Sequence, residues 1–386
     1  MANCSGLDAF RNFGDYTALL RDRTGYNETL LFECRADICS AVYGLGLPDL
    51  SGIGVVVGYL LSTLLGPLFT LLILVIPFRH ARLQKMLAAG LATFFESAVY
   101  FAFAIQVATI TTLAPKDWEA KSTSFGDYEV RVAGLVSVIC LLPLLCPIAL
   151  LSSVKTGGVT GNHRDDDNEA KARTSHRLTL FTITVILFCY PFVSQSTHNF
   201  AETQIGEGKG KGGATYVSDY DWDKVAGICY ARLSRRDHNI IRAFQLLASL
   251  SILLFAIGVL VPAGLRRLKH NFPEKNARWE KAGAKLDDAS RLFTSKDAAW
   301  LRYILIFVPT LLAVPLFWGF WKLRTIQKNL SEMTRGTYEG DEWGFGQVMA
   351  ITIFLPVAAE MIFVRKRAIR DGSMVSDKHG GSERKD

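Results

Sequence analysis

The stretch from Gly52 to Phe78 contains no charged residue, and it constrains the fold more than any other part of the chain. About 20 apolar residues are enough to cross the hydrocarbon of a bilayer as a helix. Soluble domains spread their apolar residues at the period of a helix or a strand, whereas this chain concentrates them in unbroken blocks. The sequence therefore excludes a soluble cytosolic enzyme and a disordered chain.

Six further apolar blocks follow, which predicts an all-α fold: a polytopic membrane helix bundle of about seven transmembrane helices. In hydrocarbon each span must be helical, because every backbone N–H and C=O group has to be satisfied within the segment. The expected spans are Gly52–Phe78, Met86–Leu113, Val132–Leu151, Leu178–Ser194, Ala243–Leu265, Trp300–Trp321 and Phe345–Val364.

The distribution of basic residues predicts how the bundle is oriented. The chain carries 43 Lys and Arg against 36 Asp and Glu, and its net charge is +7. One set of loops has roughly twice as many Lys and Arg residues per loop residue as the other set. Cytosolic loops of membrane proteins carry such an excess of basic residues. The N-terminus is therefore expected outside or in the lumen and the C-terminus inside. Contact of the basic loops with anionic headgroups explains the charge balance without nucleic acid. The denser set is 79–85, 153–177, 266–299 and 365–386.

The expected organisation has three parts. Residues 1–51 form a lumenal or extracellular segment with three cysteines. Residues 52–365 form the seven-helix transmembrane domain. Residues 366–386 form a cytosolic tail, and the Gly-Ser-Lys-Asp composition from Asp371 onward predicts disorder.

Cysteines and glycosylation sequons both fall on the predicted lumenal side. Four of the seven cysteines lie there, an even number in an oxidising space, so two lumenal disulfides are expected. One of them could tie the N-terminal segment to the loop 196–241, and the pairing stays open. An endoplasmic reticulum, other secretory-pathway or plasma membrane location fits this chemistry. The disulfide candidates are Cys4, Cys34, Cys39 and Cys229. The sequons, which predict surface loops of a glycoprotein, are at Asn3, Asn27 and Asn329.

Glu96 is the first candidate catalytic residue, because it is an ionisable residue near the middle of the second span. An acid at that depth costs roughly 3 kcal/mol on insertion and marks a functional site by default. Tyr100, Phe103 and Gln106 follow at i+4, i+7 and i+10, and we expect them to form a polar-aromatic stripe facing the bundle. Without a basic partner, burial favours a neutral carboxyl that can donate a proton. The alternative is a neutral carboxyl that bonds to another helix as structural glue.

Asp49 and Glu360 are candidate substrate-binding residues, together with Gln106. Asp49 lies at the mouth of the bundle, where it or Ser51 could instead cap the first helix. Glu360 lies near the inner interface beside a basic run, and a snorkelling or ion-paired role is the alternative there.

Small and aromatic residues recur in the spans. In the first span the small residues repeat every four positions, so they share one helix face and favour close packing. The aromatic residues of the second span either line a cavity, where ring faces can stabilise a cation, or pack in the core. The small residues are Gly54, Gly58, Ser62 and Gly66, and the aromatic residues are Phe94, Phe95, Tyr100, Phe101 and Phe103.

The stretch from Cys34 to Leu61, CRADICSAVYGLGLPDLSGIGVVVGYLL, resembles a large group of fungal multi-pass membrane proteins. These have a lumenal Cys-containing segment and a PD-x-x-GIGV-like start of the first helix. The likeness is sharp over this stretch and diffuse over the other spans. The chain is also broadly similar to the membrane-bound terpene cyclases of meroterpenoid pathways, and it lacks the DxDD acid motif of soluble class II cyclases.

This similarity implies an enzyme of secondary metabolism, an intramolecular lyase or isomerase, that cyclises an epoxy-farnesyl-type chain within the membrane. Glu96 would protonate the epoxide or terminal alkene, Tyr100 and Phe103 would stabilise carbocations, and a base would remove the last proton. No cofactor and no metal is expected, and the partners are the bilayer and a hydrophobic small molecule. A seven-helix receptor and a small-molecule transporter are the alternatives. The third span ends without a receptor-type acidic-Arg-aromatic triplet, and the chain shows no internal repeat.

Overall fold

The fold is almost entirely helical, which confirms the predicted all-α class. The computed structural model describes residues 21–22, 25–26, 28–44, 46–75, 81–117, 127–153, 164–197, 224, 227–229, 233–271, 299–335 and 338–380. The exception within them is one antiparallel pair of two-residue strands, Arg21–Asp22 (β1) and Gly25–Tyr26 (β2).

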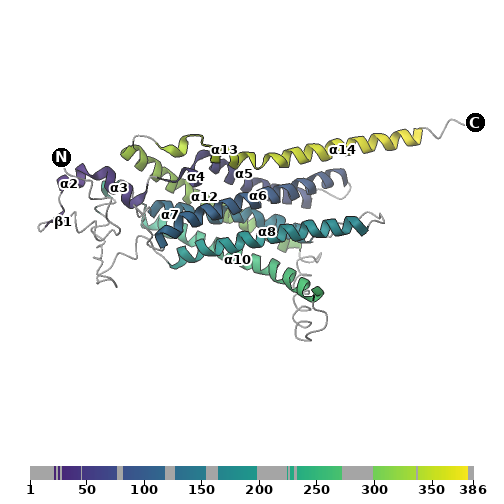
Figure 1. The fold of residues 1–386 in the computed structure, drawn as a ribbon, viewed down its shortest axis with the longest axis horizontal. Helices are drawn as coiled ribbons and strands as arrows, with labels where there is room; N and C mark the ends of the chain where they lie inside the picture. Colours follow the sequence, from purple (N-terminus) through teal and green to yellow (C-terminus); the bar gives the residue numbers. More distant parts are fainter. Residues whose placement is uncertain are drawn as a thin grey trace, which may run out of the picture.

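In the described part of the chain, three short helices precede the helix bundle. The short helices are α2 (Glu28–Glu33), α3 (Arg35–Tyr43) and the single turn α4 (Pro48–Ser51). The bundle comprises α5 (Ile53–Val75), α6 (Ala81–Asp117), α7 (Asp127–Ser153), α8 (Arg164–Thr197), α10 (Arg235–Asn271), α12 (Ala299–Arg335), α13 (Phe345–Thr352) and α14 (Leu355–Gly380), with a 3₁₀ turn η3 (Glu339–Asp341) before α13. Figure 1 shows α3 at one end of the bundle and the far end of α14 at the other.

Within the described residues, six helical segments are long and apolar enough to cross a membrane, which confirms the prediction of a multi-pass membrane protein. Six of the seven expected spans therefore have a counterpart. The span expected at Trp300–Trp321 lies in α12 and is not among the six. The six segments are Pro48–Val75, Met86–Pro115, Tyr128–Ile148, Arg173–Ser196, Arg236–Val261 and Phe345–Arg367.

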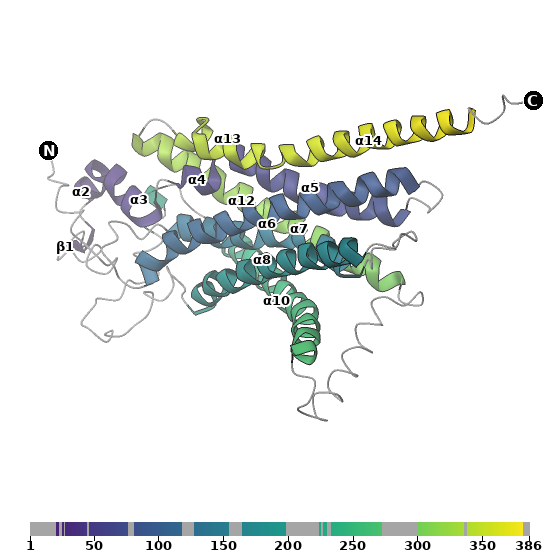
Figure 2. The same cartoon turned by 45° about the vertical axis from the view of Figure 1, so that its right-hand side comes forward.

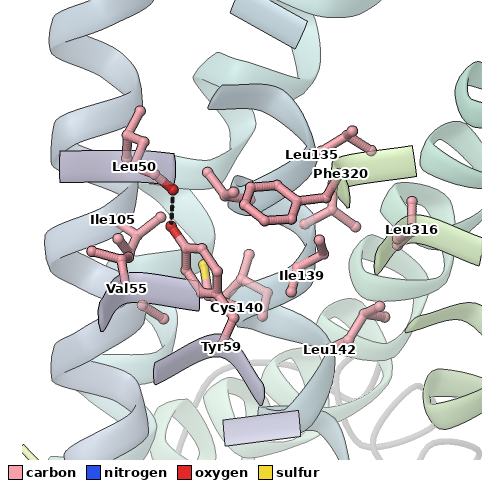
Figure 3. Close-up of a cluster of buried hydrophobic side chains, with 14 of the residues drawn as sticks. Leu50, Val55, Tyr59, Ile105, Leu135, Ile139, Cys140, Leu142, Leu316 and Phe320 are labelled. Atoms are coloured by element: carbon pink, nitrogen blue, oxygen red, sulfur yellow. Dashed lines mark hydrogen bonds between the residues drawn. The ribbon is translucent and has the colours of Figure 1, made fainter. Parts of the chain in front are cut away.

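The centre of the bundle is α7. In its candidate span, 94% of the most apolar stretch is buried, and α5, α6, α8, α10 and α12 all pack against it (Figure 2). A helix that is apolar on every side is typical of a protein core or of a membrane span, and α7 is surrounded by other helices. Figure 3 shows Tyr59 of α5 and Phe320 of α12 meeting beside α7. The Tyr59 hydroxyl donates to the Leu50 carbonyl oxygen at 3.1 Å, so its polar atom is satisfied inside the apolar cluster.

The small residues of α5 bring two other helices close, so the predicted packing role is confirmed. All four of them are buried. A Cβ atom at Gly58 would lie 3.0 Å from the Ala350 carbonyl oxygen of α13, and one at Gly66 would lie 2.9 Å from the Pro143 carbonyl oxygen of α7. Glycine at these positions allows backbones to approach at a distance that a side chain would prevent.

The last expected span is not one continuous helix. α13 ends at Thr352 and α14 begins at Leu355, because Pro356 has no N–H to bond to the carbonyl oxygen four residues before it. α14 then continues to Gly380, so the disorder expected from Asp371 is wrong up to that residue. Once a helix has formed, each further residue adds one hydrogen bond without a new nucleation cost. Residues 381–386 lie outside the described part of the chain.

A disulfide joins Cys39 of α3 to Cys229, which precedes α10. It confirms the expected tie between the N-terminal segment and the loop 196–241. Cys34 is also disulfide-bonded, and Cys4 lies outside the described residues. Of the sequon residues, Asn3 and Asn27 are likewise outside them.

Asn329, the third sequon residue, is exposed on a helix. It lies within α12, which continues to Arg335, and Leu330 and Ser331 of the same sequon are buried. The helix extends well past the expected apolar span, so residues 322–335, which the sequence assigned to a lumenal loop, are helical. Glycosylation at Asn329 stays a prediction.

Candidate functional site

Glu96 has a basic partner. Arg177 of α8 donates from Nε to Glu96 Oε1 at 2.8 Å, and 41% of the Glu96 side chain is exposed at the bundle surface. The expectation of a buried carboxyl without a basic neighbour is therefore wrong. The Glu96 side chain therefore accepts a charge-assisted hydrogen bond across the helix interface.

The predicted stripe on α6 does not face the bundle as a unit. Tyr100 and Phe103 are 48% and 38% exposed, and with Glu96 they form what we call the α6 outer strip. Gln106 is buried instead, because ten residues leave a helix position roughly 80° away from the starting face. Its amide donates to the Ser137 carbonyl oxygen at 2.8 Å and accepts from the Ser137 hydroxyl at 2.7 Å, so Gln106 fastens α6 to α7.

The three residues expected to bind substrate are not brought together. Gln106 is buried between α6 and α7, Asp49 is exposed in the first turn of α4, and Glu360 is half-buried in α14. Neither proposed helix cap forms, because the N-cap of α4 is Leu47 and carries no side-chain cap, while the Ser51 hydroxyl donates to the Leu47 carbonyl oxygen at 2.9 Å. Asp49 and Glu360 form no ion pair with any described residue.

The buried aromatic residues of α6 pack against one another and against neighbouring helices. Phe354, at the break between α13 and α14, stacks on Phe94 with ring centroids 6.1 Å apart and meets Phe101 edge-on at 5.9 Å. Phe95 meets Phe181 of α8 at 6.5 Å. Ordinary core packing, one of the two alternatives for this group, therefore describes these rings.

Polar contacts around the PD-x-x-GIGV segment form a cluster that we call the α4 clamp: Ser51, Arg324, Tyr338, Asp341 and Gln347. Arg324 is buried and donates from Nε to the Ser51 carbonyl oxygen at 2.8 Å and from Nη2 to Asp341 Oδ1 at 2.7 Å. The hydroxyls of Ser51 and Tyr338 share a hydrogen bond of 3.0 Å. These contacts fasten α4 to α12 and η3.

The Gln347 side chain of α13 caps the N-terminal end of α5, a different helix. Its Oε1 accepts from the Gly54 backbone N–H at 3.0 Å, and its Nε2 donates to the Glu342 carbonyl oxygen at 2.7 Å. The free N–H groups of a first helical turn need such partners. Cβ atoms at Gly52 and Gly54 would lie 2.4 Å and 2.6 Å from Gln347 atoms, so the glycines of the motif make room for this side chain. The motif is thus a packing site for residues far along the chain.

The outer side of the clamp is charged. Lys328 donates to Asp341 Oδ2 at 2.7 Å. The hydrogen bond from Lys328 first, and that from Arg324 second, lower the pKa of Asp341. Burial raises the pKa of Tyr338, so its hydroxyl stays neutral and can bond to Ser51.

Asp341→Asn should lower thermal stability slightly, by less than about 1 kcal/mol, because the lost ion pairs are partly exposed. The lowered pKa means that Asp341 contributes stability above its unfolded pKa and loses this contribution as the pH falls through the folded pKa. The difference in thermal stability between wild type and variant should therefore stay constant from about pH 7 to pH 5 and disappear only below about pH 4. Melting curves in detergent at several pH values measure it, with Glu342→Gln as the exposed control. A difference that disappears between pH 7 and 5 contradicts this assignment.

A cavity of about 30 Å³ lies between α7, α8 and α10. Its lining holds several polar side chains, and no acidic residue is among them. The Gln245 amide of α10 donates to the Gln195 amide oxygen of α8, and the Gln195 Nε2 donates to the Val130 carbonyl oxygen at 3.4 Å. Sequence reasoning did not identify this site. The polar lining residues are Ser137, Gln195, Ser196, Arg242, Gln245 and Ser249.

No family model matches the chain, and no curated protein or solved structure matches it either. Within the described residues, no three His, Cys, Asp or Glu side chains lie together as metal ligands would. The α6 outer strip and the cavity between α7, α8 and α10 are therefore the candidate sites.

Proposed function

We propose that the chain is a membrane-bound cyclase of a prenylated, epoxy-farnesyl-type small molecule. One observation carries the proposal: a mid-span carboxylate and two aromatic rings share the α6 outer strip, and all three are exposed. α6 packs against α8 on one side and α14 on the other, and the strip lies within the candidate span Met86–Pro115. A hydrophobic substrate dissolved in the bilayer can reach such a strip laterally.

The contacts of Glu96 suit one step of this reaction better than the other. Cyclisation begins with protonation of the epoxide or alkene and ends when a base removes a proton from the final carbocation, so no oxidant or reductant is consumed. We assign the second step to Glu96, because its carboxylate already accepts a hydrogen bond from Arg177 and can take up a proton. The faces of Tyr100 and Phe103 would stabilise the cationic intermediates.

The proposal includes seven spans, with the N-terminus in the lumen and the C-terminus in the cytosol of a secretory-pathway membrane. α12 would be the further span, and an odd number of crossings agrees with the placement of α3 and the end of α14 at opposite ends (Figure 1). The Cys39–Cys229 disulfide supports an oxidising compartment on the α3 side.

Glu96→Gln should reduce turnover at least about 100-fold, because the amide cannot accept the final proton. Membranes containing the wild type or the variant would be given a panel of epoxy-farnesyl aromatic compounds, and cyclised products would be measured by mass spectrometry. Glu332→Gln, at an exposed position of α12, is the control and should leave turnover unchanged. Unchanged turnover in Glu96→Gln at equal expression would exclude the assigned role. If the wild type consumes none of the panel, the cyclase proposal itself fails.

A seven-helix receptor is the second candidate, and the polar cavity between α7, α8 and α10 favours it. Receptors bind small molecules between helices, where a few polar groups fix the orientation of the ligand. The two candidates differ in one measurement: a receptor binds its ligand and releases it chemically unchanged, whereas a cyclase converts it.

A further inference from the structure

The last candidate span is interrupted at membrane depth. The break between α13 and α14 lies inside the segment Phe345–Arg367. Pro356 has no N–H group to donate to the Thr352 carbonyl oxygen. The Phe354 N–H, which would bond to Ala350 in a continuous helix, donates instead to the carbonyl oxygen three residues before it at 3.1 Å. The carbonyl oxygens of Ala350 and Thr352 thus lose their helical donors, and in hydrocarbon such groups need another partner.

A buried hydroxyl of α5 lies at the level of this break. α5 and α13 run in the same direction, because Gly54 lies against Gln347 and, one turn further along both helices, Gly58 lies against Ala350. Ser62 is one more turn along the same face of α5, where α13 ends. Its side chain is fully buried, and its hydroxyl has no hydrogen-bond partner in the described part of the chain. A hydroxyl oxygen is therefore available beside the break.

Three phenylalanine rings surround the same place. Cβ atoms added at the glycines one turn before and one turn after Ser62 would lie 3.0 Å from the Phe101 ring and 3.2 Å from the Phe94 ring. Both rings belong to α6. Phe354, at the break itself, packs against them with ring centroids 5.9 Å and 6.1 Å away. The hydroxyl, the break and the ring faces therefore converge on one place between α5, α6 and α13.

The groups at this place favour positive charge. Carbonyl and hydroxyl oxygens carry negative partial charge, and so do the faces of aromatic rings. The two mid-span acids lie elsewhere: Glu96 is exposed at the bundle surface, and Glu360 lies six residues beyond Phe354 on α14. Divalent cations in proteins are usually held by carboxylates. Neutral oxygen ligands alone therefore suit a monovalent cation.

We propose that an alkali-metal ion binds at this place, which we call the α13 break site, to the carbonyl oxygens of Ala350 and Thr352 and the hydroxyl of Ser62. Interrupted membrane helices coordinate Na⁺ with backbone carbonyl oxygens of this kind. The ion supplies the partner that hydrocarbon does not. The site lies on the buried side of α6, so it is separate from the α6 outer strip and does not depend on the proposed cyclase activity.

Thermal unfolding of the full-length protein in phosphatidylcholine nanodiscs tests the proposal with Na⁺ as the probe. The midpoint in sodium chloride is compared with the midpoint in N-methylglucamine chloride at equal ionic strength, because the organic cation is too large for the site. An ion that binds only the folded protein should raise the midpoint by about 3 °C or more at high concentration. Radioactive sodium should bind the folded protein saturably. Equal midpoints in the two salts would mean that water satisfies these groups, and they would overturn the proposal.

Ser62→Ala should lose most of the sodium response, because it removes a ligand oxygen and leaves the helix otherwise intact. Ser251→Ala is the matched control. Ser251 lies within the candidate span of α10, and its hydroxyl already donates to the Leu247 carbonyl oxygen at 2.8 Å. This variant should respond to sodium as the wild type does.

Pro356→Ala tests the same site without changing Ser62. Alanine supplies an N–H group for the Thr352 carbonyl oxygen and permits a continuous helix. The variant should therefore have a higher midpoint than the wild type in N-methylglucamine chloride and a smaller increase in sodium chloride. A full wild-type sodium response in both Ser62→Ala and Pro356→Ala would exclude an ion at the α13 break site.

Discussion

Gly54→Leu should cost about 3 kcal/mol or more of stability and disrupt the packing of α5 against α13. A Cβ atom at Gly54 would already lie 2.6 Å from the Gln347 carbonyl oxygen. That atom is backbone and cannot rotate away, so α5 and α13 must separate. Separation would break the hydrogen bond from the Gly54 N–H to Gln347 and leave both groups buried without a partner.

Heating detergent-solubilised protein and measuring the monodisperse fraction by size exclusion would show this as a midpoint several degrees below that of the wild type. Gly258→Leu is the matched control. Nothing lies within 4 Å of a Cβ atom at that exposed position of α10, so the same substitution meets open space there. Equal midpoints for the two variants would show that the contact between α5 and α13 is not tight.

Sequence patterns predicted the elements well, because membrane insertion depends on local composition. An uncharged block such as Gly52–Phe78 has few alternatives to a helix, since its backbone groups must be satisfied internally. The cysteine count likewise predicted a tie between the N-terminal segment and the loop 196–241, because oxidising compartments pair cysteines, and the structure shows that tie at Cys39 and Cys229. Both inferences use properties of a segment and need no knowledge of its neighbours.

Side-chain partners could not be predicted in the same way. Arg177 lies directly before the expected fourth span, and nothing in the sequence places it opposite Glu96 of another helix. That contact depends on how far α8 is shifted along α6, and packing of whole helix faces decides this shift. The expected stripe failed for a simpler reason, because Gln106 lies roughly 80° around the helix axis from the face of Glu96.

The α4 clamp was missed because its members are distant in sequence. Ser51 and Arg324 are 273 residues apart, and Gly54 and Gln347 are 293 apart. A signal was nevertheless present: Arg324 and Gln347 are polar residues at the edges of apolar segments, and buried polar groups need partners. The role of the motif glycines and of these polar residues is visible only in the fold, where the motif segment contacts both Arg324 and Gln347.

Cys39→Ser should destabilise the α3 end of the protein by about 2–5 kcal/mol. The disulfide closes a loop of 190 residues, and chain entropy alone would assign it about 5 kcal/mol. The intervening segments already cross the membrane in the unfolded reference state, which restricts that state and reduces the gain. We therefore expect the lower half of the range, with the loss concentrated where α3 meets α12 and the residues before α10.

Limited proteolysis distinguishes this local loss from global unfolding, because cleavage should appear first in the N-terminal segment while the bundle stays intact. Cys229→Ser should give the same midpoint and cleavage pattern as Cys39→Ser, and the double variant should add nothing, because all three remove one bond. Cys189→Ser, which replaces a free thiol in α8, should behave as the wild type. A double variant that is clearly less stable than either single variant would mean that each thiol makes a separate contribution, and the energy would then not belong to the disulfide.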